Sequence, residues 1–347
     1  AHVHFGREIL EVATFRGSEG NKETQQTHAS GMIKRDNAYG TFEEDVWRRD
    51  ITINALYYNI KDFSIVDLVG GMQDIKDKII RIMGKPEKRY TEDPVRMLRV
   101  VRLAAKLNFT IEEKTLAPLP KMAELLDQVS NARLFDECVK LFHAGAALRT
   151  INLLHEQSLL RPIFPQTVEA IANNEKAFLF IKAACKNTDD RIHAGKTVTP
   201  AFLFAVLLWH PLCDKMEQLI GEGMPPAQAR LLATSNVLSD QMQYTAVPKR
   251  FTMAIRDIWQ LQHRLTHKID KRTFSLPAHP RFRAAYDFLL LRAEIDAQYH
   301  EKSVWWTEFQ AADPVAQTQM FAEAAEENKK QPQKKRRKKK PKKTNDD

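Results

Sequence analysis

The order of hydrophobic and polar positions divides the chain into a short strand-rich part and a long helical part. Residues 1–16 alternate between polar and apolar side chains with a break at Gly6, which predicts two short strands. In the second strand, ILEVATFR, the face that carries Ile9 and Phe15 also carries Glu11. A carboxylate among small and apolar neighbours on one strand face is a candidate functional residue.

The next segment, residues 17–40, is polar and contains four glycines, which predicts a loop. A helical pattern then runs from Thr41 to Ile60, with Thr41 as the N-cap and acidic side chains in the first turn. FSIVDLVGG predicts a strand that ends in a Gly-Gly turn, and KIIRIMG is a second short apolar segment. No later segment predicts a strand.

From Thr91 to about Ala322 the pattern is helical throughout, with interruptions at prolines. These prolines are Pro118, Pro120, Pro162, Pro165, Pro200, Pro248, Pro277 and Pro280. The sequence therefore predicts an α+β chain, with a small α/β part first, an all-helical body second and a basic tail last.

Composition indicates a globular chain without a membrane span. Hydrophobic residues make up 43% of the chain, but no apolar run reaches the ~18–20 residues that cross a bilayer. The three cysteines, Cys138, Cys185 and Cys213, are far apart and form no metal-binding or disulfide pattern. This cysteine usage indicates a reducing, cytoplasmic setting.

The net charge of +9 is concentrated at the C-terminal end. Residues 329–343 contain 11 Lys and Arg and no acid, whereas residues 1–328 are neutral in sum. Such a run repels itself and has no apolar side chains to bury, so we expect disorder and binding to a polyanion, with nucleic acid favoured over lipid headgroups. The residues expected to contact RNA are Lys334, Lys335, Arg336, Arg337, Lys338, Lys339 and Lys340.

The segment RYTEDPVRMLRVVR, residues 89–102, holds the strongest candidate chemistry. Asp93, Arg96, Arg99 and Arg102 follow one another at every third position, along one side of the predicted helix. An amphipathic helix with a solvated arginine stripe explains this pattern. A nucleotide-binding helix explains it as well.

Donor and acceptor geometry favours the second explanation for Asp93 and Arg96. A carboxylate only accepts hydrogen bonds and a guanidinium only donates them. Side by side, the two groups match the edge of adenine or cytosine, which offers one donor and one acceptor in the right order. Guanine and uracil present the opposite order, so the pair selects A or C without a template strand.

The segment RRDITINAL provides a second polar group. On the predicted helix, Asp50 and Asn54 share a face at positions i and i+4. With Arg48 and Arg49 they form a compact set suited to a ribose hydroxyl and a phosphate, although an ordinary helix surface explains the same residues.

Five segments in order resemble the bacterial poly(A) polymerases and CCA-adding enzymes, which are class II nucleotidyltransferases. They are EVATFRG, EEDVWRRDITINALYYN, VDLVGGMQDIKDKIIRIMG, RYTEDPVRMLRVVRLAAKLNF and ARLFDECVKLFHAG. The resemblance is dense over roughly residues 1–165. Later stretches such as VPKRF and HPRFRAAYDFLLLRAE resemble the poly(A) polymerase branch in particular.

The resemblance implies a nucleotidyltransferase palm with a mixed sheet, followed by a helical neck and body. The implied boundaries are residues 1–83 for the palm, 84–150 for the neck, 151–321 for an RNA-binding body and 322–347 for the disordered tail. The implied reaction transfers AMP from ATP to an RNA 3′ end and releases pyrophosphate, with two Mg²⁺ ions at the site.

The resemblance also implies roles for individual residues. Asp93 and Arg96 match the base-reading pair, and Glu11 matches one metal-binding carboxylate. Asp50 is expected to be catalytic together with Glu11. The remaining residues expected at the nucleotide are Arg49, Asn54, Arg99 and Arg16.

One family feature is absent from this sequence. The family's other metal carboxylates form an Asp-x-Asp pair upstream, and no Asp-x-Asp occurs in these 347 residues. We therefore expect an N-terminally truncated form that is nearly inactive by itself. Two alternatives stay open: a CCA-adding enzyme, and an RNA-binding module without catalysis.

Overall fold

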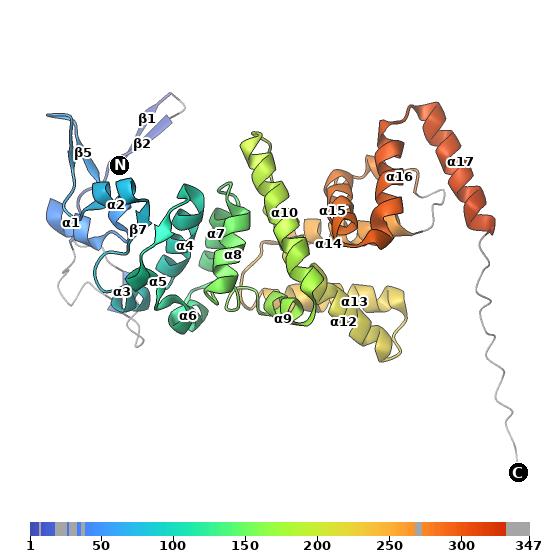
Figure 1. The fold of residues 1–347 in the computed structure, drawn as a ribbon, viewed down its shortest axis with the longest axis horizontal. Helices are drawn as coiled ribbons and strands as arrows, with labels where there is room; N and C mark the ends of the chain where they lie inside the picture. The colour runs from blue at the N-terminus through green and yellow to red at the C-terminus, as the bar shows by residue number, and fades with distance from the viewer. Residues whose placement is uncertain (7, 18–25, 28–32, 36–38, 268–272, 331–347) are drawn as a thin grey trace, which may run out of the picture. The chain divides into compact units, whose positions relative to one another are not determined.

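The computed structural model describes most of the chain (Figure 1). The described residues are 1–6, 8–17, 26–27, 33–35, 39–267 and 273–330. The expected RNA contacts at residues 334–340 lie outside them. The chain forms two compact units, Ala1–Arg256 and Asp257–Asp347.

The first unit begins with an antiparallel hairpin. Strand β1 (His2–Phe5) pairs with β2 (Glu8–Glu11) across a turn in which Gly6 has a φ of +60°. This confirms the two strands, but the second ends at Glu11 instead of continuing to Arg16, which forms only an isolated bridge with Tyr39. The side chains of both strands are exposed, so the alternation did not mark a buried face.

The polar segment predicted as a loop contains a second small hairpin, in which β3 (Gln26–Thr27) pairs with β4 (Ile33–Arg35). Helix α1 (Phe42–Arg48) follows. Its N-cap is Thr41, as predicted, with a reciprocal hydrogen bond between the Glu44 side chain and the Thr41 main chain.

The prediction that this helix continues to Ile60 was wrong beyond Arg48. The chain turns into a short 3-10 helix, η1 (Thr52–Asn54), and then into β5 (Tyr57–Asn59), which pairs with β6 (Ser64–Val66). Ile51 is fully buried and forms a bridge with Ile82. A long-range contact thus overrides the local helical pattern.

Helix α2 (Gly71–Asp77) leads into β7 (Ile79–Ile80), which pairs in parallel with β8 (Thr110–Ile111). The expectation of no strand after residue 84 was therefore wrong. The described strands form four two-stranded sheets, three antiparallel and one parallel. Between β7 and β8 lie α3 (Pro86–Glu92) and α4 (Val95–Leu107).

The rest of the first unit is helical, as predicted, and Pro165, Pro200 and Pro226 each begin a helix. Its elements are α5 (Glu113–Leu116), α6 (Leu119–Met122), η2 (Ala123–Gln128), α7 (Asn131–Phe142), α8 (Ala147–Glu156), α9 (Pro165–Asn173), α10 (Glu175–His193), α11 (Pro200–Leu207), α12 (Trp209–Gly221) and α13 (Pro226–Gln241). Helix α4 packs against α7 and α8. Every residue of α11 after Pro200 is buried.

Helix α14 (Lys249–Thr266) crosses the boundary between the units. The second unit continues with η3 (Leu276–Ala278), α15 (Phe282–Ile295), η4 (Ala297–Tyr299), α16 (His300–Ala311) and α17 (Pro314–Lys330). Its core includes Trp306, whose indole N–H donates to the carbonyl of Leu265 at 2.9 Å. In the described part of the chain, no helix combines the length and apolarity needed to cross a membrane.

Candidate active site

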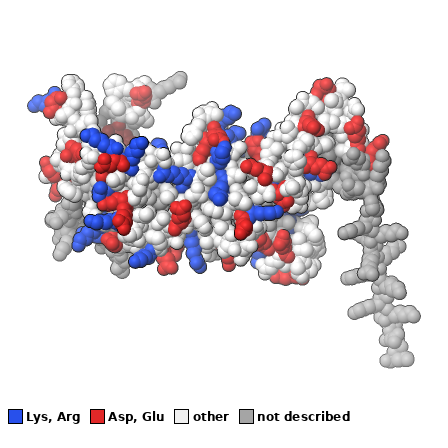
Figure 2. Space-filling view, viewed as in Figure 1, with Lys and Arg blue, Asp and Glu red and all other residues white. Residues whose placement is uncertain are grey.

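A cleft of about 800 Å³ in the first unit lies between the N-terminal segments and α4. Its volume is in the range of small-molecule binding sites. All the candidate residues of the first unit line it, namely Glu11, Arg16, Arg49, Asp50, Asn54, Asp93, Arg96 and Arg99. On the face shown in Figure 2, acidic and basic side chains are interleaved.

Asp50 connects the segment after α1 to helix α4. Arg99 Nη1 donates to Asp50 Oδ2 at 2.7 Å, and Asn54 Nδ2 donates to Asp50 Oδ1 at 3.5 Å. Asp50 and Asn54 therefore meet, although no α-helix holds them as predicted. Burial lowers the pKa of Arg99, but the adjacent Asp50 carboxylate outweighs burial and raises the pKa above its ordinary value. Arg99 is thus an anchored side chain, unlike the solvated stripe that the pattern allowed.

Asp93 and Arg96 line the same cleft but are not paired with each other. Arg133 Nη2 donates to Asp93 Oδ2 at 2.8 Å. Arg96 Nη1 donates to Glu92 Oε2 at 3.0 Å and to the main-chain carbonyl of Arg89 at 2.9 Å. The sequence interpretation missed Glu92, although its i, i+4 spacing to Arg96 was a usable signal.

Arg89 is a further residue that the sequence did not single out. Its Nη2 donates to the carbonyls of Arg48 and Arg49 at 2.8 and 2.5 Å, at the C-terminal end of α1. Its Nη1 donates to Glu92 at 2.9 Å. Burial, reinforced by the nearby Arg96, lowers the pKa of Arg89. Arg89 therefore joins the end of α1 to the Glu92–Arg96 pair.

Asp45 is the most connected carboxylate in the cleft. Its Oδ2 accepts hydrogen bonds from the Tyr57 hydroxyl at 2.5 Å and from Arg49 Nη2 at 3.3 Å. Its Oδ1 accepts from the main-chain N–H of Arg16 at 3.1 Å. Burial by itself raises the pKa of Asp45, but these hydrogen bonds outweigh burial and leave the pKa below its ordinary value. The sequence predicted only a local role for Asp45, as an acidic residue in the first turn of a helix.

Glu11 lies at the end of β2, and its side chain is 80% exposed. The His2 side chain lies beside it, with 3.9 Å between His2 Nε2 and Glu11 Oε1. Among the described residues, no group of three or more His, Cys, Asp or Glu side chains could hold a metal ion. These residues therefore do not fit a two-metal centre, and the chemistry below takes no step through a metal.

Three family models match consecutive parts of the chain. They describe a poly A polymerase head domain (residues 1–81), a probable RNA- and SrmB-binding site of polymerase A (108–171) and a polymerase A arginine-rich C-terminus (222–343). Poly(A) polymerase I of Escherichia coli O6:H1 is 47% identical over 336 residues, which cover 94% of this chain and 72% of the relative. The chain belongs to the bacterial poly(A) polymerase family.

Solved structures of related folds support the same architecture. A tRNA nucleotidyltransferase complexed with a primer tRNA and an incoming ATP analog has a TM-score of 0.59 at 22% identity, covering 89% of this chain and 80% of the other. The Bacillus stearothermophilus CCA-adding enzyme in complex with CTP has a TM-score of 0.55 at 21% identity, covering 87% of this chain and 64% of the other. At these identities the likeness establishes the fold.

Proposed function

We propose that this protein transfers AMP from ATP to RNA 3′ ends without a template and releases pyrophosphate. The observation that carries the proposal is that one cleft brings the Arg49–Asp50 segment against the Asp93–Arg96 segment. The 47% identity to a Poly(A) polymerase I over most of the chain supports the same activity.

We propose that Asp93 and Arg96 select the base. Asp93 Oδ1 accepts one hydrogen bond, from the N–H of Val95, and Oδ2 accepts one, from Arg133. Each carboxylate oxygen can accept a second hydrogen bond. Arg96 uses only Nη1 in its contacts with Glu92 and Arg89 within the described residues. Both side chains can therefore form further hydrogen bonds, with the edge of a base. Their present partners restrict the orientations that the two side chains can adopt.

The other cleft residues would contact the rest of the nucleotide. Asp50, held by Arg99 and Asn54, is placed to accept a hydrogen bond from a ribose hydroxyl. Glu11 is proposed as one metal-binding carboxylate of the same cleft, although the described residues provide no group of three ligands around it.

RNA would be bound mainly by the helical part and by the basic tail. In this proposal residues 1–83 form the palm, 84–150 the neck, 151–321 the RNA-binding body and 322–347 the tail. Residues 334–340 would contact RNA phosphates.

The test is extension of a labelled RNA primer with ATP or CTP, in the presence and absence of Mg²⁺. It is run on this chain and on any longer in-frame form of it, with Asp50→Asn as the inactive control. We expect A tails with ATP from at least one of the two forms, and no products with CTP from either form. Ordered addition of C and A would identify a CCA-adding enzyme. Salt-sensitive RNA binding without extension by either form would identify a binding module.

A further inference from the structure

Three separate segments of the cleft converge on one carboxylate. Asp45 Oδ1 accepts the main-chain N–H of Arg16, and Asp45 Oδ2 accepts from Arg49 and from the Tyr57 hydroxyl. The side chain of Asp45 is only 13% exposed, so these hydrogen bonds are partly shielded from water. Asp45 therefore fixes two arginine residues, one through its main chain and one through its side chain.

The ring of Tyr57 is held independently of its hydroxyl. Its centroid lies 4.8 Å from that of Phe42 and 6.3 Å from that of Phe15, with both pairs close to edge-to-face. Phe15 and Phe42 also contact each other, at 5.5 Å between centroids. This aromatic trio leaves the Tyr57 hydroxyl little freedom, so the hydroxyl is a stable anchor for its polar partners.

Hydrogen bonds hold one edge of the Arg49 guanidinium group, while much of the side chain stays exposed. Its Nε donates to the Tyr57 hydroxyl at 3.2 Å and its Nη2 donates to Asp45, while 46% of the side chain remains exposed. Within the described residues, Nη1 has no hydrogen-bond partner. An arginine immobilised in this way has already lost much of its side-chain entropy, so binding an anion through the remaining donors costs less.

The composition of the cleft indicates which anion this is. Arg16 and Arg49 are two of six arginines that line the cleft, against four carboxylates. Of these carboxylates, Asp45 pairs with Arg49, Asp50 with Arg99 and Asp93 with Arg133, so the lining keeps an excess of positive charge. The part of ATP that carries most negative charge is its triphosphate, and guanidinium groups match phosphate oxygens in geometry as well as in charge.

We propose that Asp45 and Tyr57 are positioning residues that hold Arg49 and Arg16 as a phosphate-binding wall for the triphosphate of ATP. This inference rests on the proposed function, because it names the part of the substrate that one wall of the same cleft recognises. Tyr57 and Asp45 act through the arginines and do not themselves touch the nucleotide.

The test compares the dissociation constants of ATP and adenosine for the full chain, for Tyr57→Phe and for Tyr58→Phe. Tyr57→Phe keeps the aromatic trio and removes only the hydroxyl. Tyr58 is the matched control, because it lies on the same strand, is 60% exposed and does not line the cleft. We expect Tyr57→Phe to weaken ATP binding about five- to tenfold and to leave adenosine binding unchanged. Tyr58→Phe should bind both ligands like the parent chain.

A second variant, Asp45→Asn, removes the charge while keeping the shape, and inorganic tripolyphosphate serves as a competitor that carries no nucleoside. We expect tripolyphosphate to displace ATP from the parent chain and to bind Asp45→Asn at least about tenfold more weakly. Equal losses for ATP and adenosine in both variants would show a purely structural role and overturn the proposal. Unchanged ATP binding would also overturn it. A parent chain that bound neither ATP nor adenosine would contradict the proposed function itself.

Discussion

A single carboxylate, Asp67, fixes the direction of the chain between β6 and α2. Its two oxygens accept hydrogen bonds from the main-chain N–H groups of Val69, Gly70, Gly71 and Met72, at 2.8–3.0 Å. Burial by itself raises the pKa of Asp67, but these four donors outweigh burial and leave the pKa below its ordinary value. Asp67 therefore stabilises the fold more strongly in its ionised form than in its protonated form.

This pKa shift predicts an acid-dependent loss of stability. Because the folded-state pKa is depressed, the contribution of Asp67 is complete above its ordinary value of 3.8 and is lost as the pH falls through the folded value. We expect Asp67→Asn to lower the free energy of unfolding at pH 7 by about 1–2 kcal/mol. The difference from the parent chain should shrink below about pH 4. Urea unfolding curves between pH 2 and pH 7 measure both quantities.

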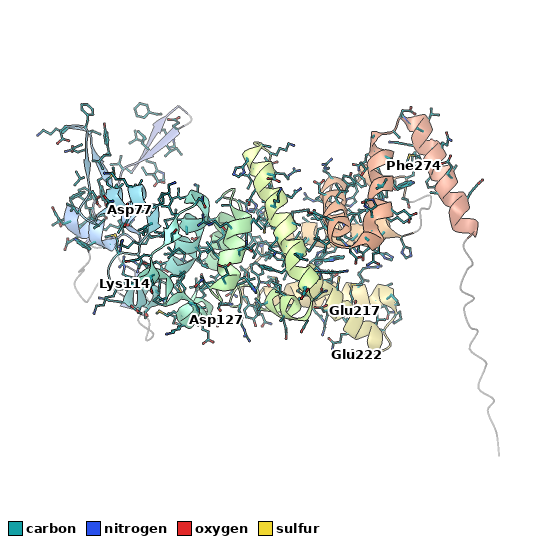
Figure 3. All side chains as sticks on the ribbon, in the orientation of Figure 1. Asp77, Lys114, Asp127, Glu217, Glu222 and Phe274 are labelled. Carbon is teal, nitrogen blue, oxygen red and sulfur yellow. The ribbon has the colours of Figure 1, made fainter. Side chains whose placement is uncertain are left out.

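The matched control for Asp67 is Asp77→Asn, at the last residue of α2 (Figure 3). Both carboxylate oxygens of Asp77 accept from the exposed side chain of Gln73. This variant should stay within about 0.5 kcal/mol of the parent chain at pH 7. Equal effects of the two substitutions would show that the four main-chain donors at Asp67 carry no special stabilisation.

Base selection provides a second prediction at the scale of one side chain. Arg96→Ala removes the proposed donor, while Glu92 keeps its hydrogen bond with Arg89 and is not left unpaired. We expect kcat/KM for ATP to fall by about ten- to a hundredfold and the preference for ATP over GTP to narrow. Arg161→Ala is the control, since Arg161 is exposed and does not line the cleft. An unaltered ATP-to-GTP ratio in Arg96→Ala would remove Arg96 from base selection.

At the scale of elements, the sequence predicted what is decided locally. Thr41 caps α1, and the predicted interruptions at Pro165 and Pro200 lie where α9 and α11 begin, because these signals act within one turn of a helix. The chain beyond Arg48 was mispredicted because burial of Ile51 against a distant segment decides its conformation. The two-residue strand β8 pairs with β7, some thirty residues earlier in the chain. No local sequence pattern predicts such a pairing.

The candidate site shows the same division. Sequence motifs and a family resemblance named eight residues that the structure brings to one cleft, although the segment of Asp50 and Asn54 does not form the predicted helix. The partners that hold these residues were missed, since Arg133 lies forty positions from Asp93 and Tyr57 lies twelve from Asp45. The position of Asp45 in the first turn of a helix already explained an acidic residue there, so its role in the cleft was not predicted.

The packing of α2 against η1 depends on a glycine and yields an element-scale prediction. A Cβ at Gly71 would lie 2.5 Å from the carbonyl oxygen of Thr52, in the 3-10 turn beside Asp50 and Asn54. We expect Gly71→Ala to destabilise the first unit by about 1–3 kcal/mol. Thermal or urea unfolding measures the loss.

Gly221→Ala is the comparison for Gly71→Ala. Gly221 is also helical, at the end of α12, but a Cβ there meets no atom within 4 Å. Alanine favours helix over glycine, so this variant should be neutral or stabilised by up to about 1 kcal/mol. A Gly71→Ala protein as stable as Gly221→Ala would show that α2 can shift away from η1 at little cost.

At the scale of the whole molecule, the charge is divided unevenly between a neutral body and a basic tail. Residues 1–328 sum to zero, so the excess positive charge lies in the last residues of the chain. A neutral body gives little long-range attraction to RNA. The salt-dependent part of RNA affinity should therefore come mainly from the tail, through release of counterions from the phosphates that it contacts.

This division of charge predicts that substitutions in the tail lower the affinity for RNA and leave the affinity for ATP unchanged. Replacing the seven basic residues at 334–340 with serine should weaken RNA binding and reduce the slope of log affinity against log salt by up to about 5. The melting temperature and the dissociation constant of ATP should not change. A variant with residues 331–343 in scrambled order keeps the charge, and it should retain the parent slope because counterion release depends on charge rather than on sequence. If the serine variant kept the full slope, the folded helices would have to supply the phosphate contacts despite their neutral sum.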